Sequence, residues 1–444
     1  MSALLLFATS ALLASVSVYA HPHDSLHARH EHAVRAALPD TWYHTEEIEA
    51  HKLFRRDAAG TPSTDGGSYP QVGSPTWLAA YPSTTPDNTK LPQAWVDKLN
   101  AAVAAGQIPN IPQTTEANGS APVYPQGVQQ DSTDVCSTTN RVCRNPDDIW
   151  DAPPGTVGIG FDDGPLPTSA ALFDFLTANN QKATHFFIGV NILASPDLFT
   201  RAFATMNDDI AVHTYTHPYM TTLTNIDVVA QLGWSMQLIH DSTGGRLPRY
   251  WRPPYGDTDN RVGAIARHVF GLKTIIWNQD TSDWSLGQAG GTTLDAINAN
   301  MQKWLTGPKS PGLIILEHEL TKDSVQGFIN NYPLMKSNGW QTVSMAQLAA
   351  GQGANLWQNA AGNTSPVTSM AIVAAAAAPT NGSSTPPPTT TGSSGTATSA
   401  GSSTGSKGSA AAQATGSGKP KSGASSLRYP SWALVLAAAW LALL

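Results

Sequence analysis

The strongest constraint on the fold is a regular alternation of strand-like and helix-like runs between residues 157 and 336. Short apolar runs, typical of buried strands, alternate with longer runs whose apolar residues recur at helical spacing. The strand-like runs are 157–161, 183–187, 210–213, 250–252, 272–277 and 313–317, and the helix-like runs are 169–179, 226–243, 261–268, 293–304 and 322–336. This alternation predicts parallel strands joined by crossover helices. About two hundred residues are enough for one barrel-like core.

Reactive side chains follow the strand-like runs. Asp162 and Asp163 come at the end of the first run, and His213 and His217 follow roughly fifty residues later. In a parallel barrel the carboxyl ends of the strands meet at one edge, where such enzymes carry their chemistry. Because neighbouring carboxylates repel each other, at least one of the two aspartates needs a cation or a proton.

The histidine pair favours a cation. One helical turn after His213 would aim the imidazoles of His213 and His217 the same way, and Asp163 would complete a set of three ligands. Three protein ligands leave positions for water and substrate, as in catalytic metal sites, and Asp162 then remains free as a base. The alternatives are an ordinary Asp-Asp-Gly-Pro turn with two solvated histidines, and a zinc peptidase. We reject the peptidase because its glutamate position beside the first histidine is Thr214 here.

Three further stretches carry reactive groups at the ends of strand-like runs: YWRPPYG at 250–256, DTSDW at 280–284 and LIILEH at 313–318. The series FDDGP, HTYTH, RPPYG, DTSDW and LEH resembles the five motifs of the polysaccharide deacetylase family, also called carbohydrate esterase family 4 or the NodB homology domain, over residues 154–350. The resemblance implies an α/β fold, an incomplete and distorted (β/α) barrel. A secreted, wall-anchored chain of this kind is most similar to the fungal chitin deacetylases.

The resemblance implies roles for the reactive residues. Asp163, His213 and His217 would hold one divalent metal ion, zinc or cobalt, and Asp162 would be the general base acting on water. His318 would protonate the leaving nitrogen.

The resemblance also implies supporting residues. Arg252, itself held by Asp283, would orient Asp162 and keep it ionised, although the sequence leaves open whether Asp280 or Asp283 meets Arg252. The Tyr255 backbone N–H would bind the oxyanion. The residues that would line the pocket for the acetyl methyl group are Trp284 and Leu316.

The composition favours an uncharged polymer as the substrate. The net charge is −7 and only 13% of residues are charged, which argues against binding nucleic acid or anionic lipids. Trp251 and Trp284 are candidate sugar-stacking faces, with burial in the core as the alternative. The predicted function is hydrolysis of the N-acetyl groups of chitin to give chitosan and acetate. An acetylxylan esterase of the same family and an inactive wall glycan-binding protein remain alternatives, and no protein partner is predicted.

The two ends of the chain predict export and anchoring. An apolar start ending in small residues reads as a secretory signal, and the apolar end from Trp432 is too short for the ~20 residues of a spanning helix. We expect a glycosylphosphatidylinositol (GPI) anchor at Ser422, placing the protein in the cell wall and on the outer face of the plasma membrane. The expected divisions are a signal (1–20), a His-rich leader (21–68), a Pro-rich extension packing on the barrel without chemistry (69–153), the catalytic domain (154–350), a disordered Ser/Thr/Gly/Pro-rich stalk (351–422) and an anchor propeptide (423–444).

Export also bears on the cysteines and sequons. Cys136 and Cys143 are the only cysteines, and an oxidising compartment predicts a disulfide between them that closes a small loop. The N-glycosylation sequons begin at Asn118, Asn363 and Asn381.

Overall fold

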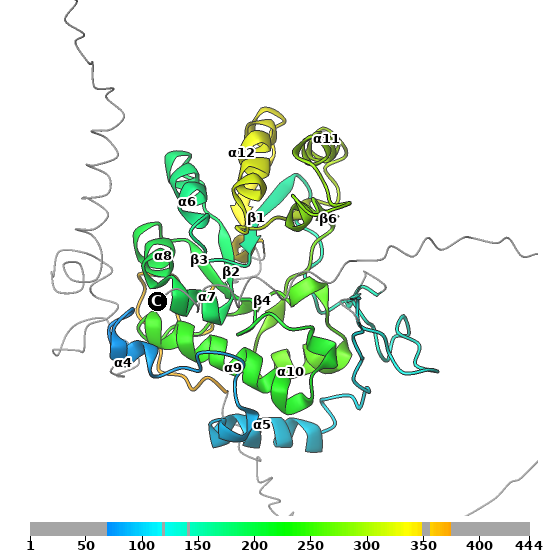
Figure 1. The fold of residues 1–444 in the computed structure, drawn as a ribbon, viewed down its shortest axis with the longest axis vertical. Coiled ribbons are helices and arrows are strands. Elements are labelled where there is room, and N and C mark those ends of the chain that lie inside the picture. The colour runs from blue at the N-terminus through cyan, green and yellow to red at the C-terminus, as the bar shows by residue number, and fades with distance from the viewer. Residues whose placement is uncertain (1–68, 118–119, 140–142, 349–355, 374–444) are drawn as a thin grey trace, which may run out of the picture. The chain divides into compact units, whose positions relative to one another are not determined.

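The fold is built around one sheet of parallel strands. The computed structural model describes residues 69–117, 120–139, 143–348 and 356–373 (Figure 1). The strands are β1 (Thr156–Asp162), β2 (Thr184–Phe187), β3 (Asp209–Val212), β4 (Tyr250–Trp251), β5 (Lys273–Thr274), β6 (Gln279–Asp280), β7 (Leu313–Leu316) and β8 (Gln341–Ser344). Their order is β5-β4-β3-β2-β1-β7-β6, with β8 paired to β1, and every pairing is parallel. No ladder joins β5 to β6 among the described residues. The predicted incomplete barrel is therefore confirmed.

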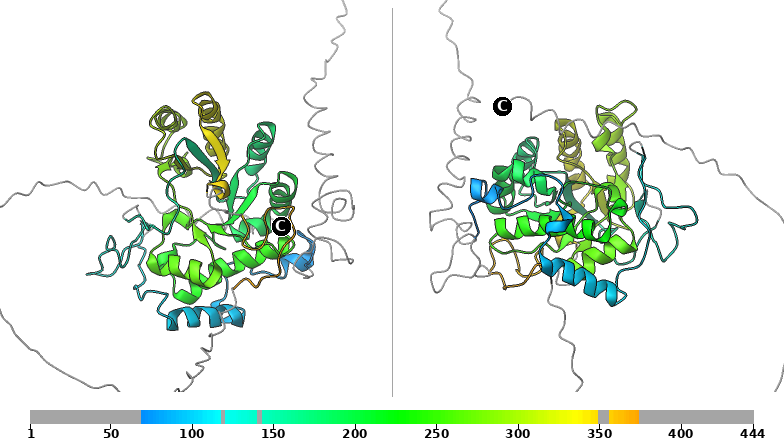
Figure 2. Two further views of the ribbon diagram at one scale, coloured as in Figure 1. Left: turned by 180° about the vertical axis from the view of Figure 1, so that it is seen from behind. Right: turned by 60° about the horizontal axis from the view of Figure 1, so that its bottom comes forward.

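Helices cover the outside of this sheet (Figures 1 and 2). The five predicted helices are present, with ends within two residues of those expected: α6 (Ser169–Ala178), α9 (Asn225–Ser242), α10 (Asn260–Phe270), α11 (Leu294–Leu305) and α12 (Lys322–Ser337). The pattern missed the short strands β6 and β8 and three consecutive short helical segments, α7 (Gly189–Ala194), α8 (Pro196–Thr200) and the π-helical η3 (Arg201–Thr205). Elements of two to six residues are too short to show a hydrophobic period. The remaining short helices are α4 (Pro75–Leu78), η1 (Asn88–Lys90), η4 (Met220–Thr222), η5 (Pro254–Gly256), η6 (Asp283–Ser285) and η7 (Met345–Gln347).

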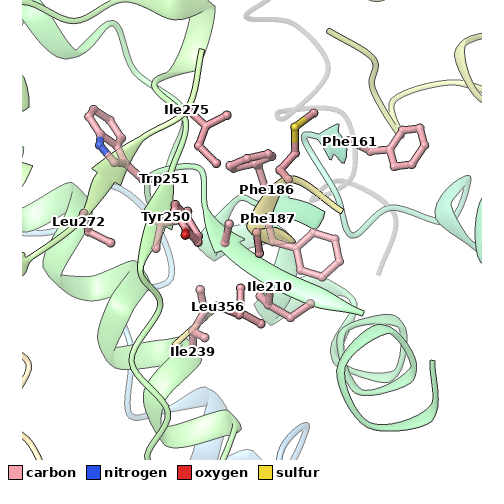
Figure 3. Close-up of a cluster of buried hydrophobic side chains, with 14 of the residues drawn as sticks. Phe161, Phe186, Phe187, Ile210, Ile239, Tyr250, Trp251, Leu272, Ile275 and Leu356 are labelled. Atoms are coloured by element: carbon pink, nitrogen blue, oxygen red, sulfur yellow. The ribbon is translucent and has the colours of Figure 1, made fainter. Parts of the chain in front are cut away.

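The core joins aromatic and aliphatic side chains from neighbouring strands. Phe186, Ile210 and Tyr250 lie in one cluster with Trp251 (Figure 3) and are at most 1% exposed. Trp251 is fully buried, and its indole N–H donates to Thr274 Oγ1 at 3.1 Å. The expectation that Trp251 offers a face to sugar is therefore wrong, because its ring fills the core.

One helix of the Pro-rich extension packs on the catalytic domain. Helix α5 (Gln93–Ala104) lies against α9 and α10. Trp95 of this helix is 3% exposed and makes edge contacts with Trp234 and Phe270. The Trp95 ring packs against Gly233, where an added Cβ would lie 2.5 Å from the ring.

The folded domain also extends beyond the expected boundary at residue 350. Trp357 is fully buried, and the Arg249 backbone N–H donates to Leu356 O at 3.0 Å. The expected start of the stalk at residue 351 is therefore too early, because Trp357, Leu356 and Val367 give residues 356–373 enough apolar surface to bury.

Several sequence expectations lie outside the described residues. These are the signal, the leader, residues 374–422 of the stalk, the anchor propeptide and the sites Asn118, Asn381 and Ser422. Within the described part of the chain, no helix combines the length and apolarity needed to cross a bilayer.

A buried charge cluster lies at the middle of the sheet. His185 of β2 is fully buried, with Nδ1 hydrogen-bonded to Glu319 and Nε2 3.2 Å from Asp208 Oδ2. Burial lowers the pKa of His185, but the two carboxylates outweigh burial and raise this pKa to about 10.

The two helix-interior glycines Gly233 and Gly263 provide a matched test of how α5 docks. An added methyl at Gly263 would meet nothing within 4 Å, so Gly263→Ala should raise the free energy of unfolding by about 0.5–1 kcal/mol through helix propensity. Gly233→Ala should instead lower it by about 1–2 kcal/mol, because the Trp95 ring has no room to move. Denaturant unfolding of the two variants checks this, and equal stabilisation by both would contradict the docking of Trp95.

The His185 cluster predicts a pH dependence of stability. Because folding raises the pKa of His185 above 6.5, its stabilising contribution is complete below about pH 6.5 and is lost as the pH rises through about 10. The free energy of unfolding of the wild type should fall more steeply between pH 7.5 and 10 than that of His185→Gln, as measured by urea unfolding along a pH series. Parallel curves for the two proteins would refute the assignment of a charged His185.

Candidate active site

The carboxyl ends of the parallel strands gather the candidate residues at one edge. Asp162 is the last residue of β1, His213 and Arg252 directly follow β3 and β4, and Asp283 and His318 follow β6 and β7 within three residues. An isolated parallel bridge pairs Asp162 with His318. The fold thus brings together the five strand-end residues that the sequence singles out.

Asp163, His213 and His217 form a compact cluster with metal-ligand geometry. Asp163 Oδ1 lies 3.3 Å from His213 Nε2 and 3.2 Å from His217 Nε2, and the three ligand atoms lie within 4.8 Å of one another. Asp163 Oδ1 is buried and accepts no hydrogen bond. Burial raises the pKa of Asp163, but His217 and His213 outweigh burial and hold this pKa well below its usual range. A buried anionic oxygen facing two imidazole nitrogens fits a divalent cation of the zinc type.

The two imidazoles converge through a loop. The helical turn expected after His213 is wrong, because Thr214 and His217 adopt positive φ values of 64° and 61° and residues 213–217 are not helical. The His217 backbone N–H donates to Thr214 Oγ1 at 3.0 Å. His213 Nδ1 bonds to the Arg252 carbonyl oxygen at 2.7 Å, which leaves Nε2 for a metal.

Two amide side chains that the sequence did not single out hold the segments that carry the three candidate ligands. Gln231 of α9 accepts hydrogen bonds from the backbone N–H groups of Tyr215 and Thr216 at 3.0 and 2.9 Å. Asn191 Nδ2 donates to the Asp163 carbonyl oxygen at 2.7 Å. Gln231 is 3% exposed, and its place within an apolar helical run was the one signal that could have revealed it.

Asp162 is held by a buried arginine. Arg252 Nη1 lies 2.6 Å from Asp162 Oδ1, and the guanidinium stacks over the Phe186 ring at 4.2 Å. Asp162 Oδ2 lies 3.9 Å from His213 Nε2. One oxygen of Asp162 is thus anchored while the other faces the ligand cluster.

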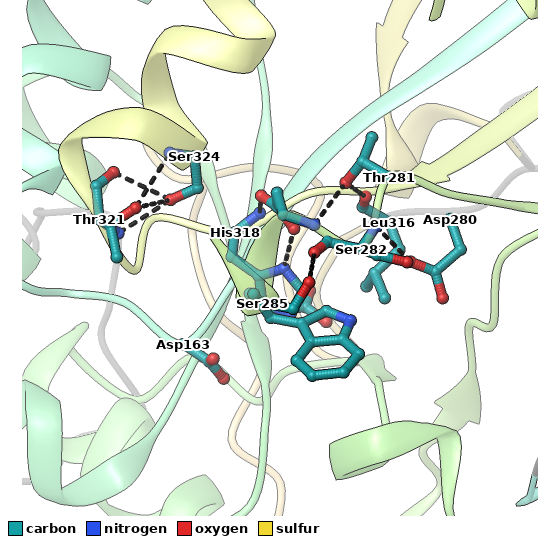
Figure 4. Close-up of polar contacts among 12 residues, drawn as sticks. Asp163, Asp280, Thr281, Ser282, Ser285, Leu316, His318, Thr321 and Ser324 are labelled. Atoms are coloured by element: carbon teal, nitrogen blue, oxygen red, sulfur yellow. Dashed lines mark hydrogen bonds and ion pairs between the residues drawn. The ribbon is translucent and has the colours of Figure 1, made fainter. Parts of the chain in front are cut away.

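Asp283 pairs with His318. Its Oδ1 lies 2.6 Å from His318 Nδ1, and its Oδ2 accepts from the His318 backbone N–H at 2.9 Å. The expected Arg252–Asp283 pair is therefore wrong: Asp283 bonds to His318, and Arg252 Nη2 has no hydrogen-bond partner among the described residues. Asp280 does not meet Arg252 either, and accepts from the Ser282 backbone N–H at 2.8 Å (Figure 4).

His318 is poised to carry a proton. Burial lowers the pKa of His318, but the charge and hydrogen bond of Asp283 outweigh burial and raise this pKa to about 10. Nδ1 is occupied by Asp283, so the proton that His318 can give away is the one on Nε2.

The remaining pocket candidates lie on the same loops. Tyr255 in η5 has φ 60° and is 48% exposed. Leu316 ends β7 and is buried, whereas Trp284 in η6 is half-buried. Five of the eight described non-glycine residues with positive φ lie in the motif loops, which indicates backbone strain stored at a functional site; they are Asp163, Thr214, His217, Tyr255 and Ser282.

The cysteines form the predicted disulfide, whereas one sequon does not fit the fold. Cys136 and Cys143 are bonded to each other. Asn363 is 5% exposed, its Nδ2 donates to Asp208 O at 2.7 Å and its Oδ1 accepts from Trp357 Nε1 at 2.8 Å. A glycan on Asn363 is incompatible with this packing, because the nitrogen that would carry the glycan is buried and bonded.

Comparison with known proteins places these residues in a family context. A model of the polysaccharide deacetylase family matches residues 151–274. Chitin deacetylase 3 of Cryptococcus neoformans var. neoformans is 40% identical over 346 residues, covering 76% of this chain and 79% of that protein. The chitin deacetylase of Amylomyces rouxii is 36% identical over 251 residues, covering 54% and 58%. Among solved structures, the chitin deacetylase from the fungal pathogen Colletotrichum lindemuthianum is 26% identical with a TM-score of 0.40, covering 45% of this chain and 90% of that one.

Removal of one ligand should abolish stable metal binding. We expect the full chain to bind one zinc ion per molecule and His217→Ala to weaken binding at least about 100-fold, more than the 10- to 100-fold typical of outer partners. His240→Ala is the matched control, because His240 contacts Asp241 and is not part of the ligand cluster. Competition with a chromophoric chelator measures the affinities, and equal binding by both variants would exclude His217 as a ligand.

Proposed function

Because the chain belongs to the polysaccharide deacetylase family and is a hydrolase acting on N-acetyl amides, we propose that it removes acetyl groups from chitin, giving chitosan and acetate. The main support for this proposal is that a carboxylate, Asp162, and a histidine with a raised pKa, His318, lie beside the same cluster of candidate metal ligands. Asp162 is a buried carboxylate and His318 carries a raised pKa, and both lie beside Asp163. The names of the related chitin deacetylases support chitin as the polymer.

The ligand cluster supports a metal-dependent reaction. We propose that Asp163, His213 and His217 hold one zinc or cobalt ion, since their donor set fits such an ion. When bound, the ion polarises the acetyl carbonyl and makes water more acidic.

The reaction needs a base for the attacking water and an acid for the leaving nitrogen, because an amide is a poor electrophile with a poor leaving group. Asp162 takes the proton from water, and its pairing with Arg252 holds it in position to do so. His318 gives its Nε2 proton to the departing nitrogen, and Asp283 stabilises the imidazolium before the transfer. The backbone N–H of Tyr255 binds the oxyanion, in a loop whose strained φ fixes its direction.

Two alternatives use the same site. An esterase acting on O-acetylated xylan would share the base, the acid and the metal, so a side-by-side panel of acetylxylan and chitin oligomers separates the two. An inactive glycan-binding protein would bind the oligomers without releasing acetate. The complete pairs Asp162–Arg252 and His318–Asp283 favour an active enzyme.

The cellular setting is also a proposal, supported by the sequence of the chain ends. We propose secretion after cleavage of residues 1–20, GPI anchoring at Ser422 and a place in the cell wall. Glycans at Asn118 and Asn381 accord with this route. Release of the protein from intact cells by a phosphatidylinositol-specific phospholipase tests the anchor, and retention after this treatment would refute it.

Acetate release from chitin oligomers is the direct test of the proposed activity. Chelation should abolish this release and zinc or cobalt should restore it. Asp162→Asn should lower kcat by about 10³-fold or more while metal still binds, because the variant keeps the shape of the side chain without a base. Normal turnover by this variant would remove the assignment.

Two neighbouring aspartates allow a matched test of the acid. Asp283→Asn should lower kcat/KM by about 10²- to 10⁴-fold, because His318 loses the carboxylate that orients and charges it. Asp280→Asn makes the same chemical change three residues away, where the carboxylate accepts only a backbone hydrogen bond, and should change kcat/KM less than threefold. Similar losses in the two variants would show that Asp283 has only a structural role.

A further inference from the structure

Two stacked tyrosine rings border the ligand cluster. The rings of Tyr219 and Tyr255 lie 4.0 Å apart at an angle of 25°, an offset-stacked arrangement, and the Tyr255 ring makes an edge contact with His217 at 4.6 Å. Tyr255 is the only aromatic side chain among the large exposed hydrophobic residues of the described part of the chain. Tyr219 lies outside the five motifs and is half-buried.

A buried hydrogen-bond network fixes the two tyrosines relative to each other. Asp257, two residues after Tyr255, accepts from the backbone N–H of Thr221 at 2.7 Å and from its hydroxyl at 2.8 Å. Thr221 lies two residues after Tyr219, and both Asp257 and Thr221 are fully buried. Hydrogen bonds between Asp257 and Thr221 thus join the two segments that carry the rings.

The Pro-rich extension completes this network. Thr139 donates to Asp257 Oδ1 and Thr138 to the Gly256 carbonyl oxygen, each at 2.6 Å. Thr114 binds Thr221 through both its backbone N–H and its hydroxyl. Thr138 and Thr139 lie inside the loop closed by the Cys136–Cys143 disulfide. The sequence predicted that the extension packs on the barrel without chemistry. Through these hydrogen bonds the extension holds the segments that carry Tyr219 and Tyr255 in place.

We propose that the exposed Tyr255 ring contacts the sugar next to the one that carries the reacting acetyl group, and that Tyr219 determines the preference for longer chains by holding that ring in place. The inference rests on the proposed function, since it assigns a neighbouring subsite to the same site. A pyranose ring has an apolar C–H face, and an aromatic face carries partial negative charge, so the two stack without any charged group. This suits an uncharged polymer. Because Trp251 is buried, the tyrosine pair takes the role first expected of that tryptophan.

The stacked pair of Tyr219 and Tyr255, called the tyrosine platform below, can be tested through Tyr219. Loss of the Tyr219 ring removes the support of Tyr255 without altering a motif. For the wild type, kcat/KM should rise with chain length from the dimer to the hexamer of N-acetylglucosamine. Tyr219→Ala should flatten this rise, with a loss of about tenfold on the hexamer and little on the dimer, which is the loss of one ring-stacking contact. Tyr219→Phe keeps the ring and should keep the rise. Leu78→Ala, which removes an exposed apolar side chain from α4, is the matched surface control.

Binding measured without turnover separates this inference from the proposed function. Calorimetric titration of the wild type and of Tyr219→Ala with the hexamer should show an about tenfold weaker Kd for the variant, whether or not acetate is released. If the hexamer binds with this difference but no acetate appears, the platform stands and the proposed function fails. Unchanged binding by Tyr219→Ala, or equal losses on dimer and hexamer that reveal a disturbed His217, would overturn the platform.

Discussion

The arrangement of the candidate site follows from the need to balance the charges of two adjacent carboxylates, Asp162 and Asp163. Asp162 and Asp163 are consecutive, so their charges must be balanced by different partners that approach from different directions. Arg252, after β4, balances Asp162, whereas the imidazoles of His213 and His217, after β3, face Asp163. Only a fold that delivers several strand ends to one edge supplies both partners at once. The order of the strands in the sheet therefore determines which charged groups meet at the site.

The division of work between the two carboxylates follows from these partners. In the proposed reaction, the Arg252 guanidinium holds one oxygen of Asp162 in a fixed position and leaves the other facing the ligand cluster as the base. Asp163 Oδ1 has no hydrogen-bond partner among the described residues. Its charge is thus left for a cation. In the same proposal, Asp283 supports the acid His318 as Arg252 supports Asp162, so that each proton-transfer group has its own counter-charge.

The sequence predicted the long elements and the reactive residues, because both leave local patterns. Runs such as 226–243 show a helical period, and Asp162, Asp163, His213 and His217 occupy short motifs next to strand-like runs. Partnerships across the barrel left no such pattern: Asp283 lies about equally far in sequence from Arg252 and from His318, and it pairs with His318, which follows β7. The left-handed conformations of Thr214 and His217 accompany a tertiary contact that the sequence does not show, because Gln231 of α9 binds the backbone N–H groups between them. The packing of Trp357 shows the same limit, because one tryptophan in a polar stretch gives no periodic signal.

The disulfide loop has a consequence beyond the stability of the extension. Thr138 and Thr139 follow Cys136 directly and bond to the segment that carries Tyr255, so the Cys136–Cys143 disulfide anchors the residues that make these contacts. Cellular reductants in the cytosol keep thiols apart, whereas secretory compartments join them. In the proposed secretory setting, the contacts of Thr138 and Thr139 with the Tyr255 segment would therefore depend on an oxidising compartment.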